Sequence, residues 1–189
     1  MLLLATLASL LGPLPAPAPT VGGCITMNTD ALPLNKRVSP LDSISFKVEK
    51  SDVKLCYSRP SLKGRTMIGG ESVPYGKIWR TGSNEPTMIH TTGPLEIAGV
   101  KVAAGTYSIY TVPGEKEWEV IVNKSITQWG EESGYTSAVQ AQEVGRGKVK
   151  SETLKASVEK LTFTAEPNAE KTKSLVLEWQ TTRVAIPVK

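Results

Sequence analysis

Residues 43–58 read SISFKVEKSDVKLCYS, and apolar residues alternate with polar ones on both sides of a polar turn. Every second residue is apolar over residues 44–48 and again over residues 53–57. Alternation with period two places one set of side chains on a single face of a strand. Two such runs joined by the short sequence Lys50-Ser51-Asp52 predict a β-hairpin.

The same pattern continues to the C-terminus. Short apolar or β-branched runs recur about every ten residues, with Gly and Pro between them. They lie at residues 88–92, 95–98, 100–102, 107–112, 118–123, 143–152, 158–166, 175–180 and 183–188. This spacing predicts one all-β domain over residues 43–189, an antiparallel β-sandwich or a barrel-like fold. Residues 127–142 fit the pattern least well and leave room for a helical turn.

The amino-acid composition and the motifs of the sequence argue against several classes of function. The 189 residues are 40% hydrophobic and 21% charged, which suits one globular domain with a real core. The net charge of +4 is mildly basic, but no basic stripe is interleaved with aromatics, so we predict no nucleic-acid partner. His90 is the only histidine, and HExxH, paired CxxC, GxSxG and glycine-rich phosphate loops are missing from the sequence. We therefore assign no catalytic residue, no metal and no cofactor, and favour a protein that is not an enzyme.

The N-terminus resembles an export leader. Residues 2–11 read LLLATLASLL, which suits the apolar core of a signal peptide, although no basic residue precedes the run. A tail of apolar residues is the alternative. Cys24 follows Val21-Gly22-Gly23, as in a bacterial lipoprotein box, so Cys24 is a candidate for lipidation. We predict a signal peptide or lipoprotein leader over residues 1–24, a linker over residues 25–42, and a protein of the periplasm, anchored in the envelope or secreted.

Two cysteines leave three alternatives open. Cys24 and Cys56 could form one disulfide, remain two free thiols, or be one lipidated and one buried cysteine. A disulfide is expected only if the protein is exported to an oxidising compartment.

Residues 57–85 interrupt the strand pattern with a long stretch rich in Gly and Pro. Such segments inside compact domains are often functional. This one carries five cations against two carboxylates, and arginine beside an amide and an aromatic ring suits the capture of a carboxylate, phosphate or sugar. The alternative is a structural network of ion pairs. The candidate binding residues are Arg59, Arg65, Lys77, Trp79, Arg80, Asn84 and Glu85.

Four blocks of sequence carry a family resemblance. They are YSRPSLKGR from residue 57, VPYGKIWRTGSNEPT from residue 73, AAGTYSIYTVPGEKEWEVIVNK from residue 103 with QWG after it, and LVLEWQTTRVAIPV from residue 175. In this order they resemble the bacterial domain-of-unknown-function family DUF2911 over roughly residues 38–189. The resemblance implies a secreted or envelope β protein, often with a lipoprotein leader, and it implies no activity.

Three functions remain open at this stage. The first is a domain that binds a small anionic or carbohydrate ligand, or an envelope protein, through residues 57–85. The second is a hydrolase or lyase in which Glu85 is the base and Arg59, Arg65 or Arg80 stabilises an oxyanion. The third is a structural or assembly module, because strand-rich chains can pair at their edges. The sequence does not indicate the oligomeric state.

Overall fold

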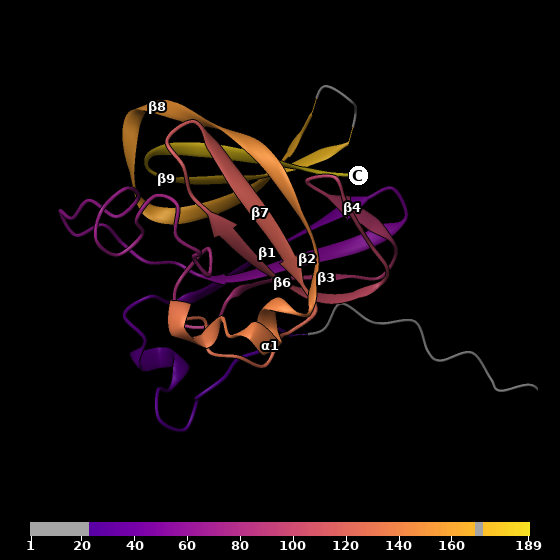
Figure 1. Ribbon diagram of the computed structural model, residues 1–189, viewed down its shortest axis with the longest axis horizontal. Coiled ribbons are helices and arrows are strands. Elements are labelled where there is room, and N and C mark those ends of the chain that lie inside the picture. Colours follow the sequence, from indigo (N-terminus) through magenta and orange to yellow (C-terminus); the bar gives the residue numbers. More distant parts are fainter. Residues whose placement is uncertain (1–22, 169–171) are drawn as a thin grey trace, which may run out of the picture.

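The computed structural model describes residues 23–168 and 172–189. The apolar run of the predicted leader falls in residues 1–22 and lies outside the described residues. The described chain forms nine strands and three short helical turns (Figure 1). The strands are β1 (Leu41–Val48), β2 (Ser51–Ser58), β3 (Thr87–Thr91), β4 (Leu95–Ile97), β5 (Val100–Val102), β6 (Gly105–Val112), β7 (Glu117–Asn123), β8 (Glu143–Pro167) and β9 (Lys173–Val188). The turns are η1 (Leu34–Lys36), η2 (Glu132–Gly134) and α1 (Ser137–Gln140).

The strands form one antiparallel sheet in the order β1-β2-β3-β6-β7-β8-β9-β4-β5. The all-β prediction is therefore confirmed. The sheet does not close, but β8 curves from the layer of β6 and β7 into the layer of β9 (Figure 1). Inner side chains from both layers belong to one hydrophobic core. The arrangement has the character of a sandwich made from a single folded sheet.

The predicted hairpin is present. β1 and β2 pair with Phe46 opposite Val53 and Ile44 opposite Leu55. Val53 and Leu55 are almost fully buried, so the alternating pattern reports the core-facing side of β2. The turn requires a positive φ at Glu49, and both strands extend a residue or more beyond the predicted limits.

The last four strands predicted from the sequence form only two long strands in the structure. Residues 143–152 and 158–166 both belong to β8, and residues 175–180 and 183–188 both belong to β9. The pairing of β8 with β9 shifts between Thr153 and Val158 and again between Val158 and Thr162. Such irregularities bend a strand without ending it. The residues around the bend are largely exposed and polar, so the alternation that marks a strand is lost there.

Three tryptophans meet at the centre of the core. The ring of Trp79 stacks on Trp179 of β9 at 5.9 Å and lies edge-to-face against Trp118 of β7 at 6.1 Å. Trp118 and Trp179 are fully buried, and the indole N–H of Trp79 donates to the carbonyl of Gly82. All three are core residues, and Trp79 ties the irregular segment to both layers of the sheet.

Residues 127–142 contain η2 and α1, as the helical-turn prediction allowed. The Thr136 hydroxyl caps α1 by accepting from the amide of Val139. Within the described ranges, no helix has the length and apolarity needed to cross a membrane.

Residues 25–40, most of the predicted linker, have little regular structure apart from η1. They are nevertheless packed on the domain, because Arg37 and Ser39 are buried. β1 begins at Leu41, inside the predicted linker. We call residues 23–40 the N-terminal segment.

Candidate functional site

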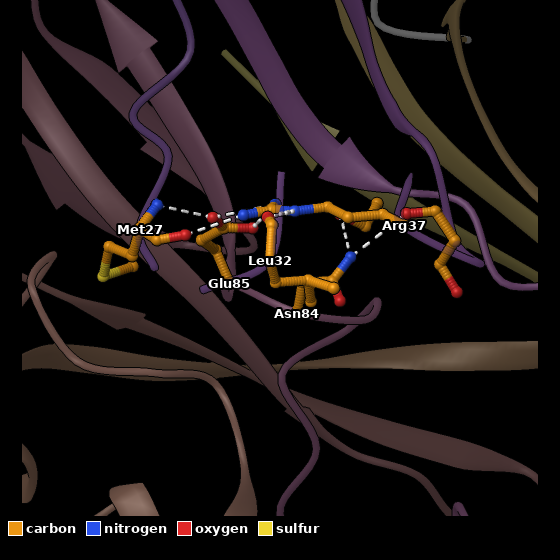
Figure 2. A network of polar contacts seen from close by, with 7 residues as sticks. Met27, Leu32, Arg37, Asn84 and Glu85 are labelled. Carbon is orange, nitrogen blue, oxygen red and sulfur yellow. Dashed lines mark hydrogen bonds and ion pairs between the residues drawn. The ribbon is translucent and has the colours of Figure 1, made fainter. Parts of the chain in front are cut away.

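The N-terminal segment is held by a buried ion pair. Arg37 Nη1 donates to both carboxylate oxygens of Glu85, at 2.7 and 2.9 Å (Figure 2). Glu85 Oε1 also accepts from the amide of Met27 at 2.6 Å, and Arg37 donates to the carbonyls of Met27 and Leu32. The side chain of Arg37 is 0% exposed and that of Glu85 is 5% exposed. Glu85 therefore has a structural partner for both of its oxygens.

Asn84 completes this attachment. Its backbone has a positive φ of 59°, a conformation that asparagine tolerates better than most residues. Its Nδ2 donates to the carbonyl of Ser39 and to the hydroxyl of Ser58, both at 3.1 Å. Asn84 and Glu85, two of the predicted binding residues, thus fasten the N-terminal segment to the domain.

A disulfide between Cys24 and Cys56 ties the start of the segment to β2. This is the first of the three alternatives that the sequence left open. The predicted lipidation of Cys24 would use the same sulfur atom, so a lipidated Cys24 cannot form this bridge. Lipidation stays a prediction.

Arg59 also has a structural role. Its guanidinium donates to the carboxylate of Asp42, the carbonyl of Leu161 and the hydroxyl of Thr162. These contacts join β1 to the C-terminal half of β8. Arg59 is therefore occupied and does not line the cleft described next.

A cleft of about 380 Å³ opens beside the N-terminal segment. Its wall comes from Val38 and Ser39, from the irregular residues 60–83, and from the turn 130–132 that leads into η2. Apolar side chains such as Val73, Pro74 and Ile78 lie next to the charged side chains of both signs. Clefts of this size and mixed lining are typical of sites for small molecules.

Arg80 is the central cation of the cleft. Trp79 exchanges both backbone hydrogen bonds with Thr111 of β6, which positions Arg80 at the edge of the core. The Arg80 side chain is half-buried, yet among the described residues it has no hydrogen bond or ion pair. Burial lowers the pKa of its guanidinium, and the charges of Glu131 and Tyr110 partly oppose this shift. Arg80 is thus a cation without a partner in the part of the chain that the structure describes.

The other predicted binding residues differ in their exposure. Arg65 lines the cleft, is exposed, and donates from Nε and Nη2 to the carbonyls of Leu62 and Ser61. Trp79 lines the cleft as part of the core. Lys77 is exposed and does not belong to the cleft wall. Of the seven predicted residues, the cleft brings together Arg65, Trp79 and Arg80.

Three further residues shape the site. Arg37 holds the N-terminal segment, and the amide oxygen of Gln180 accepts from the backbone amides of Met67 and Ile68, which supports the cleft wall. Glu131 contributes a carboxylate to the cleft. The sequence around Arg37 and Gln180 carries no signal, because each acts on a partner that is distant in the chain. In the described ranges, no three His, Cys, Asp or Glu side chains converge in a way that would hold a metal ion.

The chain was compared with known proteins. A family model described as a protein of unknown function (DUF2911) matches residues 39–188. Neither a curated protein nor a solved structure matches the chain.

Proposed function

Because the chain belongs to the DUF2911 family, whose function is unknown, we propose a function from the cleft itself. The cleft binds a small ligand that carries a carboxylate, phosphate or sulfate group, and Arg80 is the partner of that group. The observation that carries the proposal is the half-buried guanidinium of Arg80, which has no partner among the described residues.

Burying a charged group in a protein has a free-energy cost. Partial burial weakens the hydration of a guanidinium, and proteins usually pair such a group. The N-terminal segment shows this rule at Arg37, which has four hydrogen bonds to Glu85 and two carbonyls. Arg80 departs from it at the wall of a cleft. None of the guanidinium nitrogens of Arg80 is among the fully buried unpaired atoms of the described residues, so a ligand would replace contact with solvent. An anionic ligand would supply the missing partner through the planar fork that arginine offers to oxyanions.

The rest of the cleft suits a ligand with polar and apolar parts. Ser39, Ser72 and Ser83 supply hydroxyls, while Val73, Pro74 and Ile78 supply apolar surface. A volume of about 380 Å³ lies in the range of small-molecule sites. The ligand is accordingly a small amphipathic molecule that carries an anionic group, and not a long polymer.

The hydrolase alternative has less support. A general base needs a carboxylate that reaches the substrate. Glu85 is closed in its ion pair with Arg37 and is not part of the cleft wall. The assembly alternative has no specific observation in its favour.

The compartment is a separate proposal. We infer that the protein works in an oxidising environment, such as the bacterial envelope. The Cys24–Cys56 bridge supports this, because structural disulfides are rare in the cytosol. Cell fractionation with mass spectrometry under non-reducing conditions tests it, and two free thiols in a cytosolic fraction would overturn it.

Ligand binding is tested by thermal shift and calorimetry with acetate, 4-methylpentanoate, inorganic phosphate and glucuronate. A ligand at about 100 times its Kd raises the unfolding free energy by about 2.7 kcal/mol, which corresponds to a Tm increase of roughly 5–10 °C. Arg80→Gln should abolish the shift. Lys77→Gln is the matched control, because Lys77 is a cation of the same segment outside the cleft, and it should leave the shift intact. No shift with any of these anions, or an equal shift in the Arg80→Gln variant, would refute the proposal.

A further inference from the structure

The cleft carries charges of both signs that do not pair with each other. Glu131 and Glu132 line it together with Arg80 and Arg65, and both carboxylates are on exposed residues. The negative charge of Glu131 acts to raise the pKa of the Arg80 guanidinium. Within the described residues, however, the two side chains form no ion pair.

The backbone next to Glu131 packs against Arg80. Gly130 packs directly on the stem of Arg80, since a Cβ at Gly130 would lie 2.6 Å from Arg80 Cδ and 2.7 Å from the carbonyl oxygen of Asn84. The amide of Gly130 donates to that same carbonyl at 3.2 Å. The ring of Trp129 lies 5.9 Å from the buried guanidinium of Arg37. The turn that carries Glu131 is therefore fixed against both Arg80 and the N-terminal segment.

We propose that the ligand of this cleft is a zwitterion, an amino acid or a short peptide, whose carboxylate pairs with Arg80 and whose ammonium pairs with Glu131. This proposal rests on the proposed function of the cleft as an anion site. The apolar wall around Val73 and Ile78 takes the side chain of the ligand.

Electrostatics favour this class over the alternatives. A ligand with only negative charge gains from Arg80 but is repelled by Glu131 and Glu132, which stand in the same cleft. A neutral sugar leaves Arg80 without a partner. A zwitterion pairs with Arg80 through its carboxylate and with Glu131 through its ammonium. The ammonium also offsets the repulsion between the ligand carboxylate and the glutamates of the cleft. Opposite charges in one cleft thus favour a ligand with both.

Three compounds with the same branched chain separate these contributions. Leucine carries both charges, 4-methylpentanoate lacks the ammonium, and 3-methylbutylamine lacks the carboxylate. Amide NMR titrations of the whole protein measure each Kd from the signals of Gly82 and Gly130, and leucyl-leucine serves as a larger zwitterion. We expect the better zwitterion to bind about 3- to 10-fold more tightly than 4-methylpentanoate, as partly exposed ion pairs allow, and 3-methylbutylamine to bind most weakly.

Charge-neutralising variants assign the effect to the cleft. Glu131→Gln should remove the advantage of the zwitterion while leaving the affinity for 4-methylpentanoate equal or higher. Glu115→Gln, an exposed carboxylate outside the cleft, is the matched control and should change neither value. A general loss of folding would weaken the binding of zwitterions and of 4-methylpentanoate alike. A loss that affects only the zwitterions therefore reports the role of Glu131 in the cleft.

The outcomes separate this proposal from the one on which it rests. If 4-methylpentanoate binds as tightly as both zwitterions, or if Glu131→Gln leaves the preference intact, the zwitterion proposal is wrong and the anion site stands. If no anion or zwitterion perturbs the cleft, both proposals are wrong.

Discussion

Replacing Arg37 by alanine should strongly destabilise the domain. The substitution removes a side chain that is 0% exposed and leaves the carboxylate of Glu85, which is 5% exposed, without its cation. It also removes donors to the carbonyls of Met27 and Leu32. Breaking one partner of a buried ion pair typically costs about 3–5 kcal/mol, because the remaining charge is uncompensated. That is a large part of the roughly 5–15 kcal/mol that stabilises a typical domain.

Urea denaturation measures the effect as a shift of the midpoint at constant slope. Lys47→Ala is the control, because the Lys47–Asp52 pair has side chains that are 71% and 53% exposed and should contribute less than about 0.5 kcal/mol. The double variant Arg37→Met with Glu85→Leu should recover at least half of the loss, since it leaves no buried charge. A loss below about 1 kcal/mol for Arg37→Ala, similar to Lys47→Ala, would show that the ion pair does not hold the N-terminal segment as described.

Three further predictions concern the bridge, the histidine and the turn beside Arg80. Reduction of the Cys24–Cys56 disulfide, whose cysteines are 32 positions apart, should lower the unfolding free energy by about 3–4 kcal/mol, and an unchanged urea midpoint in reductant would contradict this. Burial holds the pKa of His90 in the folded protein below its ordinary 6.5, so the unfolded chain binds the proton more readily. The folding stability that this group contributes is therefore present above pH 6.5 and falls as the pH drops toward the folded pKa. The slope from this group is at most about 1.4 kcal/mol per pH unit, and His90→Gln should flatten the pH dependence of the urea midpoint between pH 6.5 and 5; an unaltered slope would refute the assignment. Gly130→Ala should cost about 1–3 kcal/mol and weaken ligand binding, because its Cβ would lie 2.6 Å from Arg80 Cδ, whereas a variant with normal stability and binding would show that the turn adapts freely.

The sequence predicted the strands where one face is buried. The alternation at residues 53–57 corresponds to core-facing side chains of β2. The continuity of β8 was not predicted, because residues 153–157 are mostly exposed and lose the alternation while the backbone stays extended. The bend in β8 comes from shifts in its pairing with β9. The sequence pattern within β8 cannot predict such a bend, because it depends on another strand.

The candidate site was predicted in part. The irregular residues 57–85 do supply much of the cleft wall, and Arg80 lies in it as a cation that has no partner among residues 23–168 and 172–189. Arg59 and Glu85 instead pair with Asp42 and Arg37, which lie 17 and 48 positions away. The segment therefore contains charges in structural pairs and other charges that line a cleft, and ligand binding by the latter stays a proposal. Residue type alone cannot separate them, because the difference is set by partners that only the fold brings near.

The central claim is that Arg80 binds an anion in the cleft. The most direct measurement is the NMR signal of the Arg80 Nε–H group during a titration with 4-methylpentanoate, with Arg59 as the internal reference because its guanidinium is already bonded to Asp42, Leu161 and Thr162. We predict a saturable shift of the Arg80 signal with the same Kd as the cleft amides, while the Arg59 signal stays in place. An Arg80 signal that does not move while 4-methylpentanoate binds elsewhere, or equal shifts of both arginines, would contradict the account.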